Sequence, residues 1–388
     1  MSLKSSLRAQ TGAVAVSLLG LVASGASANG DCDPTFVIQS GTMMSVKPTG
    51  SDDTANLQCA LDTAVMVGPS MRIQLQSGTF YTEQLVATGF RGTLTGEGAA
   101  KTIVTNLPGL TVAHDWTAQP PSASNRWPSL LAFVDGDFTL TDLAIHVRGD
   151  APTSGWFNHG YSFSELGHGV VVLGTEAHAR FDRVLVEGEP AQATHYGTNL
   201  LNAIFFEGYG GASPPLAGTF RVTRSTIRCA ADGAPVNNLK SANVLIANNT
   251  FEQMFFGASA AHLIDTRYEF SNNHVSGIYG AYGYNQDYSN VLENVGSTLV
   301  FRNNVVRAYV GILLDPIFGD GMNCLLAGNN FVTTEAVGIV LGSDTFGCTV
   351  VGGKSKTNVF DVGVGNVLVG VNNMGTGIGP RLQIKKVQ

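Results

Sequence analysis

A short phrase recurs along most of this chain, and its spacing constrains the fold more than any other feature. In each copy apolar and polar residues alternate and a polar pair follows, as in Val244-x-Ile246-x-Asn248-Asn249-x-Phe251. The third position of the phrase falls at residues 140, 181, 222, 246, 270, 301, 326 and 350, in steps of 41, 41, 24, 24, 31, 25 and 24 residues. A fixed period with insertions is typical of a solenoid, and the alternation indicates strands. The repeats therefore predict an all-β chain wound into stacked coils.

The second residue of the polar pair is the same in four successive copies, at Asn249, Asn273, Asn304 and Asn329. Asparagine tolerates left-handed backbone conformations and hydrogen-bonds to neighbouring backbone groups, so it suits a tight turn. Where identical turns stack, the side-chain amides can also bond to one another. We expect these four residues to form a ladder along the solenoid.

The first 28 residues have the pattern of a secretory signal peptide. Lys4 and Arg8 precede an apolar stretch from Ala13 to Val22, and residues 26 to 28 form a small-residue cleavage site. Cleavage after Ala28 predicts a secreted or periplasmic protein. No other stretch is long and apolar enough to span a membrane, so no integral membrane segment is expected.

The net charge of the chain limits the kinds of partner that it can bind. Removing two of the 22 basic residues with the signal leaves 20 basic and 29 acidic side chains, a net charge of −9. This argues against nucleic acid as a partner. Only 13% of the residues are charged and 47 are glycine, which is typical of a turn-rich secreted β-protein.

The five cysteines suit an exported protein. Cys32 and Cys59 can close an N-terminal cap by a disulfide. Cys324 and Cys348 hold the same repeat position, so a disulfide between stacked strands and a pair of buried thiols both fit. Cys229 is left over and is expected to be buried.

Residues 29–70 are predicted to form an N-terminal cap, and residues 71–388 the solenoid. Ser51, Asp52 or Asp53 can cap a short amphipathic helix whose apolar face comprises Leu57, Ala60, Leu61 and Ala64. A helix at this place would cover the open end of the core and its strand edges.

Several motifs together resemble the pectate lyase-type, or pectin lyase-like, right-handed parallel β-helix superfamily. They are the Gly-Ser-Asp-Asp-Thr run at 50–54, the Gly78-Thr79-Phe80 turn, Gly96-Glu97-Gly98 and the Asn-Asn repeats. The resemblance covers nearly all of the chain after residue 28 and implies a right-handed parallel β-helix of about ten coils. Members include polysaccharide lyases, glycoside hydrolases, adhesins and phage tail spikes, so the fold does not decide the function.

In this superfamily the strand before each phrase belongs to the sheet that floors the binding groove. The corresponding segments here are 131–134, 170–173, 204–206, 312–314 and 339–341. Insertions at 146–168 and 187–202 should emerge beside that groove. Their side chains either stack on sugars or fold back on the solenoid; the candidates for substrate binding are Trp156, His159, Tyr161, His195 and Tyr196.

Charged side chains follow these groove strands: Asp135, Glu207, Asp315 and Asp344, with Lys240 and Asp265 close to the same register. Each acid alone also fits a solvated turn residue. Paired carboxylates can act as general acid and base on a glycosidic bond or can bind Ca²⁺. In a Ca²⁺-assisted lyase the metal neutralises a uronate carboxyl, and Lys240 or Arg267 removes the α-proton.

Gly167-His168-Gly169 matches a Gly-His-Gly string of the polygalacturonases. The chain lacks their Asn-Thr-Asp motif, their paired aspartates and their Arg-Ile-Lys motif. His168 therefore fits either a structural turn or a place at the groove.

The sequence predicts a secreted, carbohydrate-active β-helix protein that cleaves an extracellular polysaccharide by β-elimination or hydrolysis. Polysaccharide is the expected partner, and Ca²⁺ is the one cofactor to test. The alternative is a non-catalytic adhesin, glycan-binding or surface scaffold protein. The two differ in whether the candidate catalytic residues gather within reach of one sugar unit: Glu207, Asp265, Asp315, Lys240, His168 and Arg267.

Overall fold

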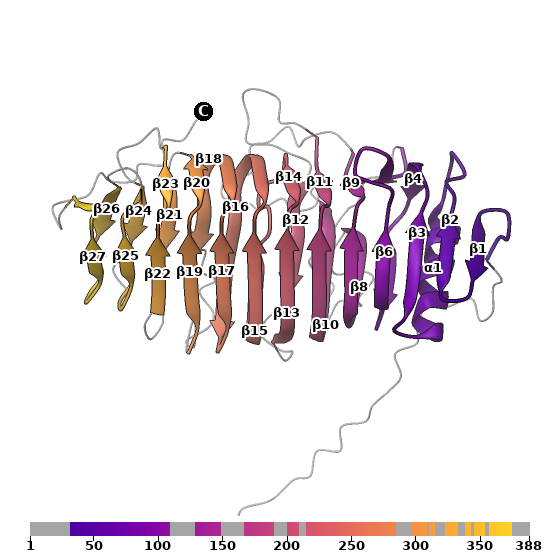
Figure 1. The fold of residues 1–388 in the computed structure, drawn as a ribbon, viewed down its shortest axis with the longest axis horizontal. Helices are drawn as coiled ribbons and strands as arrows, with labels where there is room; N and C mark the ends of the chain where they lie inside the picture. The colour runs from indigo at the N-terminus through magenta and orange to yellow at the C-terminus, as the bar shows by residue number, and fades with distance from the viewer. Residues whose placement is uncertain are drawn as a thin grey trace, which may run out of the picture. The chain divides into compact units, whose positions relative to one another are not determined.

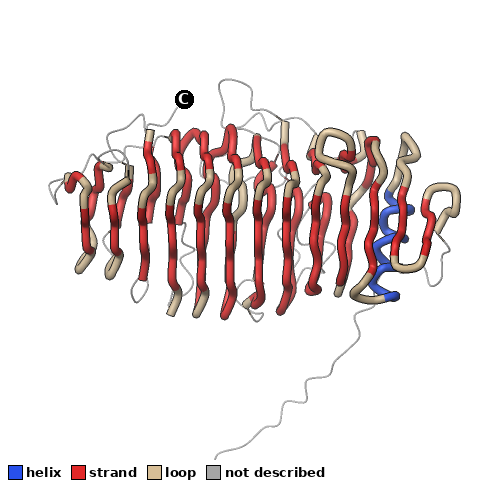
Figure 2. Tube along the Cα trace, viewed as in Figure 1, coloured by secondary structure: helices blue, strands red, loops and turns tan. Residues whose placement is uncertain are grey.

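The structure, a computed structural model, describes residues 32–108, 129–148, 167–189, 200–208, 215–284, 296–308, 310–314, 323–332, 338–342, 345–353 and 357–374. Most of these residues lie in strands, and the chain winds in stacked coils (Figures 1 and 2). The parallel strands of successive coils form three sheets, which we number sheets 1 to 3. No helix within these ranges is long and apolar enough to cross a membrane.

Sheet 2 is built by the repeated phrase. Its strands pair in parallel in this order: β2 (Met43–Val46), β3 (Met71–Leu75), β6 (Arg91–Thr95), the ends of β8 (Ser129–Thr141) and β10 (Gly167–Asp182), β13 (Leu216–Thr223), the end of β15 (Val236–Ala247), β17 (Arg267–Ser271), β19 (Thr298–Arg302), β22 (Asn323–Ala327), β25 (Thr349–Val351) and β27 (Val367–Val369). The eight aligned repeat positions pair in register, from Leu140 opposite Phe181 to Leu326 opposite Val350. The predicted alignment is confirmed.

Sheets 3 and 1 complete each coil. Sheet 3 comprises β4 (Gly78–Thr82), β7 (Thr102–Asn106), β9 (Ala144–His146), β11 (Leu185–Glu187), β14 (Thr226–Arg228), the starts of β16 (Thr250–Ile264) and β18 (His274–Tyr284), β20 (Val305–Arg307) and β23 (Asn330–Phe331). Sheet 1 comprises β5 (Leu85–Thr88), the starts of β8 and β10, β12 (Leu200–Glu207), the start of β15, the ends of β16 and β18, β21 (Val310–Leu314), β24 (Ile339–Leu341), β26 (Asn358–Asp361) and β28 (Asn372–Asn373). The predicted groove strands all lie in sheet 1.

The space between the sheets is filled by stacked apolar side chains. Phenylalanine rings contact one another within and between coils, with ring centroids 6.1 Å apart for Phe138 and Phe181 on neighbouring coils and 4.9 Å apart for Phe206 and Phe220 on one coil. Each ring is fully buried or nearly so. Burial of one such side chain contributes roughly 1.5–3 kcal/mol, and a coil can gain it only when its neighbours are present.

The asparagine ladder is confirmed. The backbone N and Nδ2 of Asn249 donate to Asn273 Oδ1 over 2.9 and 3.1 Å, and the same pattern joins Asn273 to Asn304 and Asn304 to Asn329. All four residues are buried. The left-handed backbone falls one residue before the ladder, at Asn248, Asn272 and Asn303. In each of these turns, one asparagine therefore adopts the left-handed conformation and the next one forms the ladder.

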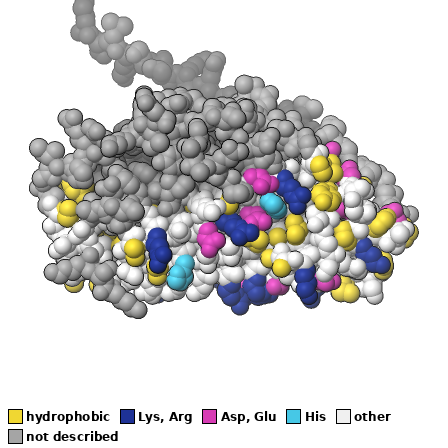
Figure 3. Space-filling model, turned by 90° about the horizontal axis from the view of Figure 1, so that it is seen from above, with side chains coloured by type: hydrophobic (Ala, Val, Ile, Leu, Met, Phe, Trp, Pro, Cys, Tyr) yellow, Lys and Arg dark blue, Asp and Glu magenta, His cyan; other side chains and the backbone are white. Residues whose placement is uncertain are grey.

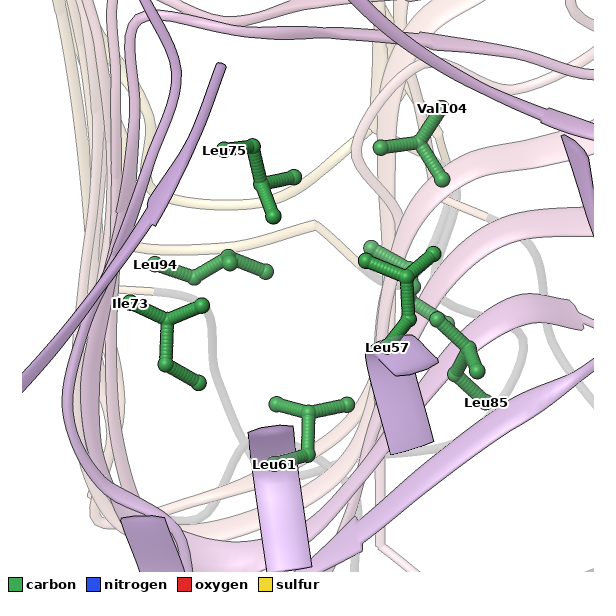
Figure 4. Close-up of a pocket in the computed structure, with 8 residues that line it drawn as sticks. Leu57, Leu61, Ile73, Leu75, Leu85, Leu94 and Val104 are labelled. Atoms are coloured by element: carbon green, nitrogen blue, oxygen red, sulfur yellow. The ribbon is translucent and has the colours of Figure 1, made fainter. Parts of the chain in front are cut away.

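Helix α1 (Thr54–Val67) lies at the N-terminal end of the coils and buries the predicted face of Leu57, Ala60, Leu61 and Ala64. Leu57 and Leu61 point into a small aliphatic space that is bounded on its other sides by Ile73, Leu75, Leu85, Leu94, Val104 and Leu131 (Figure 4). The Asp53 carboxylate accepts hydrogen bonds from the backbone N of Thr49 and Tyr81 rather than from the helix. The cap also contains β1 (Val37–Ser40), which pairs antiparallel with β2.

Two disulfides join positions on neighbouring elements. Cys32 is bonded to Cys59 of α1, and Cys324 of β22 is bonded to Cys348 on the next coil, with Cα atoms 5.6 and 4.5 Å apart. The disulfide, rather than two thiols, is thus the arrangement at 324 and 348. Cys229 is buried and forms no disulfide, as predicted, and its Sγ donates to Gln253 Oε1 over 3.0 Å.

Candidate functional site

The outer face of sheet 1 is apolar over its first coils. On β10, Val170 and Val172 belong to the main core. Alternation along a strand directs the residues between them to the outer face. There they form a separate buried cluster that comprises Val171, Leu173, Phe205 and the partly buried Val134. Over β8, β10 and β12 this face therefore presents no row of acids.

Glu207 is the one carboxylate at the end of these strands that is held on the outer face. Its neighbour Phe206 and the aligned Val236 are core residues, so Glu207 and Asn237 both point outward. Asn237 Nδ2 donates to Glu207 Oε2 over 2.7 Å. Only 2% of Glu207 is exposed, so its carboxylate is held in one orientation.

Lys240 and Asp265 lie on the next two coils at the same, carboxyl-terminal edge of sheet 1. Lys240 is exposed and follows Asn237 by three residues, about 10 Å of strand. It pairs with Ile264, and Asp265 comes directly afterwards with a left-handed φ of 45°. Glu207, Lys240 and Asp265 are thus brought to one edge on successive coils.

His168 lies at the opposite, amino-terminal edge of sheet 1. It pairs with Asn202, which precedes Glu207 by five residues, or roughly 16 Å of strand. The imidazole is 98% buried and stacks on Phe205 with ring centroids 5.6 Å apart and an interplanar angle of 17°. His168 is therefore packed on the outer face, at the opposite edge of sheet 1 from Glu207.

Two other candidates lie away from the outer face of sheet 1. Arg267 begins β17 on the outer face of sheet 2, where its Nη2 lies 3.3 Å from Glu269 Oε2. Asp135 occupies the turn after sheet 1, and its Oδ1 accepts hydrogen bonds from the backbone N of Thr175 and Glu176. Arg267 belongs to a different surface from Glu207, and Asp135 stabilises a turn.

Seven sequence candidates lie outside the described residues, and no position is assigned to them. They are Trp156, His159, Tyr161, His195, Tyr196, Asp315 and Asp344.

Asp232 was missed by the sequence reasoning. It forms isolated bridges to Asn202 and Phe256, which places it at the amino-terminal edge of sheet 1. Its Oδ2 accepts a hydrogen bond from Ser259, while its buried Oδ1 has no hydrogen-bond partner. Burial raises the pKa of Asp232 to about 7, although hydrogen bonds from Ser259 and the Gly233 backbone act in the opposite direction. In sequence, Asp232-Gly233 is indistinguishable from an ordinary turn.

The described residues offer no group of three or more His, Cys, Asp or Glu side chains suited to a metal ion. The pair formed by Glu207 and Asn237 supplies one carboxylate and one amide oxygen, whereas Ca²⁺ takes six to eight oxygen ligands. No chemical step is therefore assigned to a metal here.

Comparison with known proteins gives structural matches only. No family model and no curated protein matches the chain. It is similar to the solved polygalacturonase of Erwinia carotovora ssp. carotovora, with a TM-score of 0.53, 12% identity, and coverage of 85% of this chain and 90% of that one. It is also similar to the family 28 exopolygalacturonase of Yersinia enterocolitica, with a TM-score of 0.51, 12% identity, and coverage of 82% and 73%. At such identity the likeness concerns the fold. The chain has the right-handed parallel β-helix fold of the pectin lyase-like proteins.

Proposed function

We propose that this protein is a secreted, carbohydrate-active β-helix protein that binds and cleaves an extracellular polysaccharide at the carboxyl-terminal edge of sheet 1. The observation that carries the proposal is the Glu207 carboxylate, which is held outward by Asn237 and followed on the next coil by the exposed Lys240. A positioned carboxylate can move a proton, and an ammonium group can neutralise an anionic sugar.

This arrangement favours β-elimination over hydrolysis. Hydrolysis uses two carboxyl groups about 5–10 Å apart. Asp232 is offset from Glu207 by five residues along neighbouring strands, roughly 16 Å. Asp265 lies two coils on and four residues past the position aligned with Glu207, roughly 13 Å along the strand, so neither carboxylate is close enough to share one glycosidic bond with Glu207. β-Elimination from a uronate needs one base for the α-proton and one positive charge at the carboxylate, and Glu207 and Lys240 supply these two kinds of group.

The test is incubation of the purified protein with a panel of uronate-containing and neutral polysaccharides. Unsaturated uronate, followed by absorbance, reports elimination, and new reducing ends alone report hydrolysis. Parallel reactions with EDTA and with added Ca²⁺ establish whether a metal is required.

Glu207→Gln should reduce the rate by about 100-fold or more, since a positioned base contributes at least that factor. The matched control is Glu252→Gln, an exposed residue of sheet 3. Equal rates for the two variants would exclude Glu207 as the base.

The second candidate function is glycan binding without cleavage. The apolar outer face around Phe205 supports it. The same panel decides the matter, because a purely binding protein retains a glycan and releases no product from any member.

A further inference from the structure

The outer face of sheet 2 carries four arginines on two adjacent coils. Charged side chains of both signs lie close together on the described surface (Figure 3). On β10 and its following turn these are Arg180 and Arg183, and on the next coil they are Arg221 and Arg224. The chain as a whole has a net charge of −7, so a concentration of arginine on one face is a local feature.

Two of these arginines are already paired. Arg183 donates to Asp142 from Nε and Nη2, both over 2.7 Å, and to Asp182 from Nη1 over 2.6 Å. Arg224 donates to Asp182 from Nε and Nη2 over 2.8 and 2.5 Å. The Asp182 side chain is only 5% exposed. Both carboxylates are therefore engaged and leave little capacity for further cations.

The other two arginines remain available. Arg180 and Arg221 pair in register on neighbouring strands, about 4.8 Å apart. The Arg180 side chain is 52% exposed and reaches only to 4.0 Å from Asp182. Arg221 is exposed and makes no ion pair or side-chain hydrogen bond within the described ranges. Their aligned neighbours on the flanking coils are Thr139 and Leu245, which carry no charge.

Besides Asp182, the acidic residues near Arg180 either contact other side chains or lie at the edge of the sheet. Glu176 lies 3.7 Å from His178 Nε2, and Asp137 is the aligned neighbour of His178 at the start of the sheet 2 strands. Further along the face, Arg267 and Arg302 share the single carboxylate of Glu269. The excess of guanidinium over carboxylate therefore continues along the coil axis.

We infer that Arg180 and Arg221 form an anion-binding surface for a polysaccharide that carries carboxylate or sulfate groups, on a different sheet from the Glu207 edge. The planar guanidinium presents paired N–H donors that match the oxygens of such groups. Arg180 and Arg221 lie one coil spacing apart, so an extended polymer with closely spaced anions meets both at once, whereas a single small anion lacks the second contact. This surface holds the polymer and takes no part in cleavage, so the inference stands apart from the proposed function.

The test is native gel electrophoresis of the full protein through gels that contain polygalacturonate, dextran sulfate or neutral dextran. Arg180→Gln combined with Arg221→Gln should raise the apparent Kd for the two anionic polymers by about tenfold, and added salt should weaken the wild-type interaction. The matched control is Lys101→Gln with Arg307→Gln, which removes two exposed charges elsewhere. Polygalacturonate and dextran sulfate separate carboxylate from sulfate recognition.

Four outcomes would overturn the inference: no retardation of the wild type by either anionic polymer, equal retardation by neutral dextran, equal loss in the control variant, or an unchanged arginine variant. Binding to anionic lipid vesicles or DNA in place of both glycans would also overturn it. Cleavage of a short oligosaccharide separates the two proposals. The arginine variant should cleave it normally, and the Glu207→Gln variant should still be retarded in the gel.

Discussion

At the scale of single residues, Asn273 links three coils. Its Oδ1 accepts from Asn249, its Nδ2 donates to Ile246 O over 2.9 Å, and its backbone N donates to Asn304 Oδ1. All of these groups are buried, so none can turn to water instead when a partner is lost. The ladder is thus a chain of obligatory hydrogen bonds.

Asn273→Ala should lower the free energy of unfolding by about 2–4 kcal/mol, because it removes the buried hydrogen bonds that the side chain makes to Asn249, Ile246 and Asn304. Urea denaturation followed by circular dichroism measures the change. Asn243→Ala, at an exposed position of β15, should stay within about 0.5 kcal/mol of the wild type. Similar losses for the two variants would contradict an energetic role of the ladder.

Asp232 gives a second prediction at this scale. Its pKa of about 7 lies above the ordinary aspartate value, so the folded chain binds this proton more tightly than the unfolded chain. The folded state must therefore lose stability as the pH rises from about 4 to about 7, by at most about 1.4 kcal/mol per pH unit. Urea midpoints at mildly acidic and mildly alkaline pH should differ less in Asp232→Asn than in the wild type. An identical pH dependence would show that Asp232 is ionised in the fold.

At the scale of elements, α1 closes the end of the core that the strands leave open. Its four buried residues are those predicted from the helical period, and Leu61 is 97% buried. The amphipathic pattern of the helix fits its position, because one face packs against the first coils and the other faces solvent.

Leu61→Ala should cost about 2–5 kcal/mol of stability, since it enlarges the aliphatic space beneath the helix. Met66→Ala on the same helix is the control, because Met66 is 73% exposed and its loss should cost no more than about 0.5 kcal/mol. The midpoint of urea unfolding reports both. Equal effects would mean that α1 does not cover the core.

At the scale of the whole molecule, the dependence of stability on pH is determined by acids whose pKa values are shifted in opposite directions. Burial would raise the pKa of Asp182 and Glu269, but hydrogen bonds and charges from neighbouring arginines lower both overall. Their stabilising contribution is present above the ordinary carboxyl range and is lost as the pH falls below about 4. Asp232 acts in the reverse direction at higher pH.

Stability should therefore pass through a maximum at mildly acidic pH. The acid side of the profile should be shallow, because the arginine partners are about half exposed and each pair contributes less than about 1 kcal/mol. High salt should flatten that side further by screening. Thermal or urea unfolding across the pH range gives the profile. A steady increase in stability up to alkaline pH would contradict the assignment of Asp232.

The sequence by itself determined the coils, the register of sheet 2, the asparagine ladder and the buried face of α1. Each of these follows from a period that recurs in the chain and that the stacked coils repeat in space. The tertiary structure alone decided which outward side chains meet. Glu207 and Asn237 are 30 residues apart, Arg267 faces away on sheet 2, and Asp232 is an ordinary turn residue until other coils bury it. These properties depend on insertion lengths and on burial by distant segments, and a local pattern carries neither.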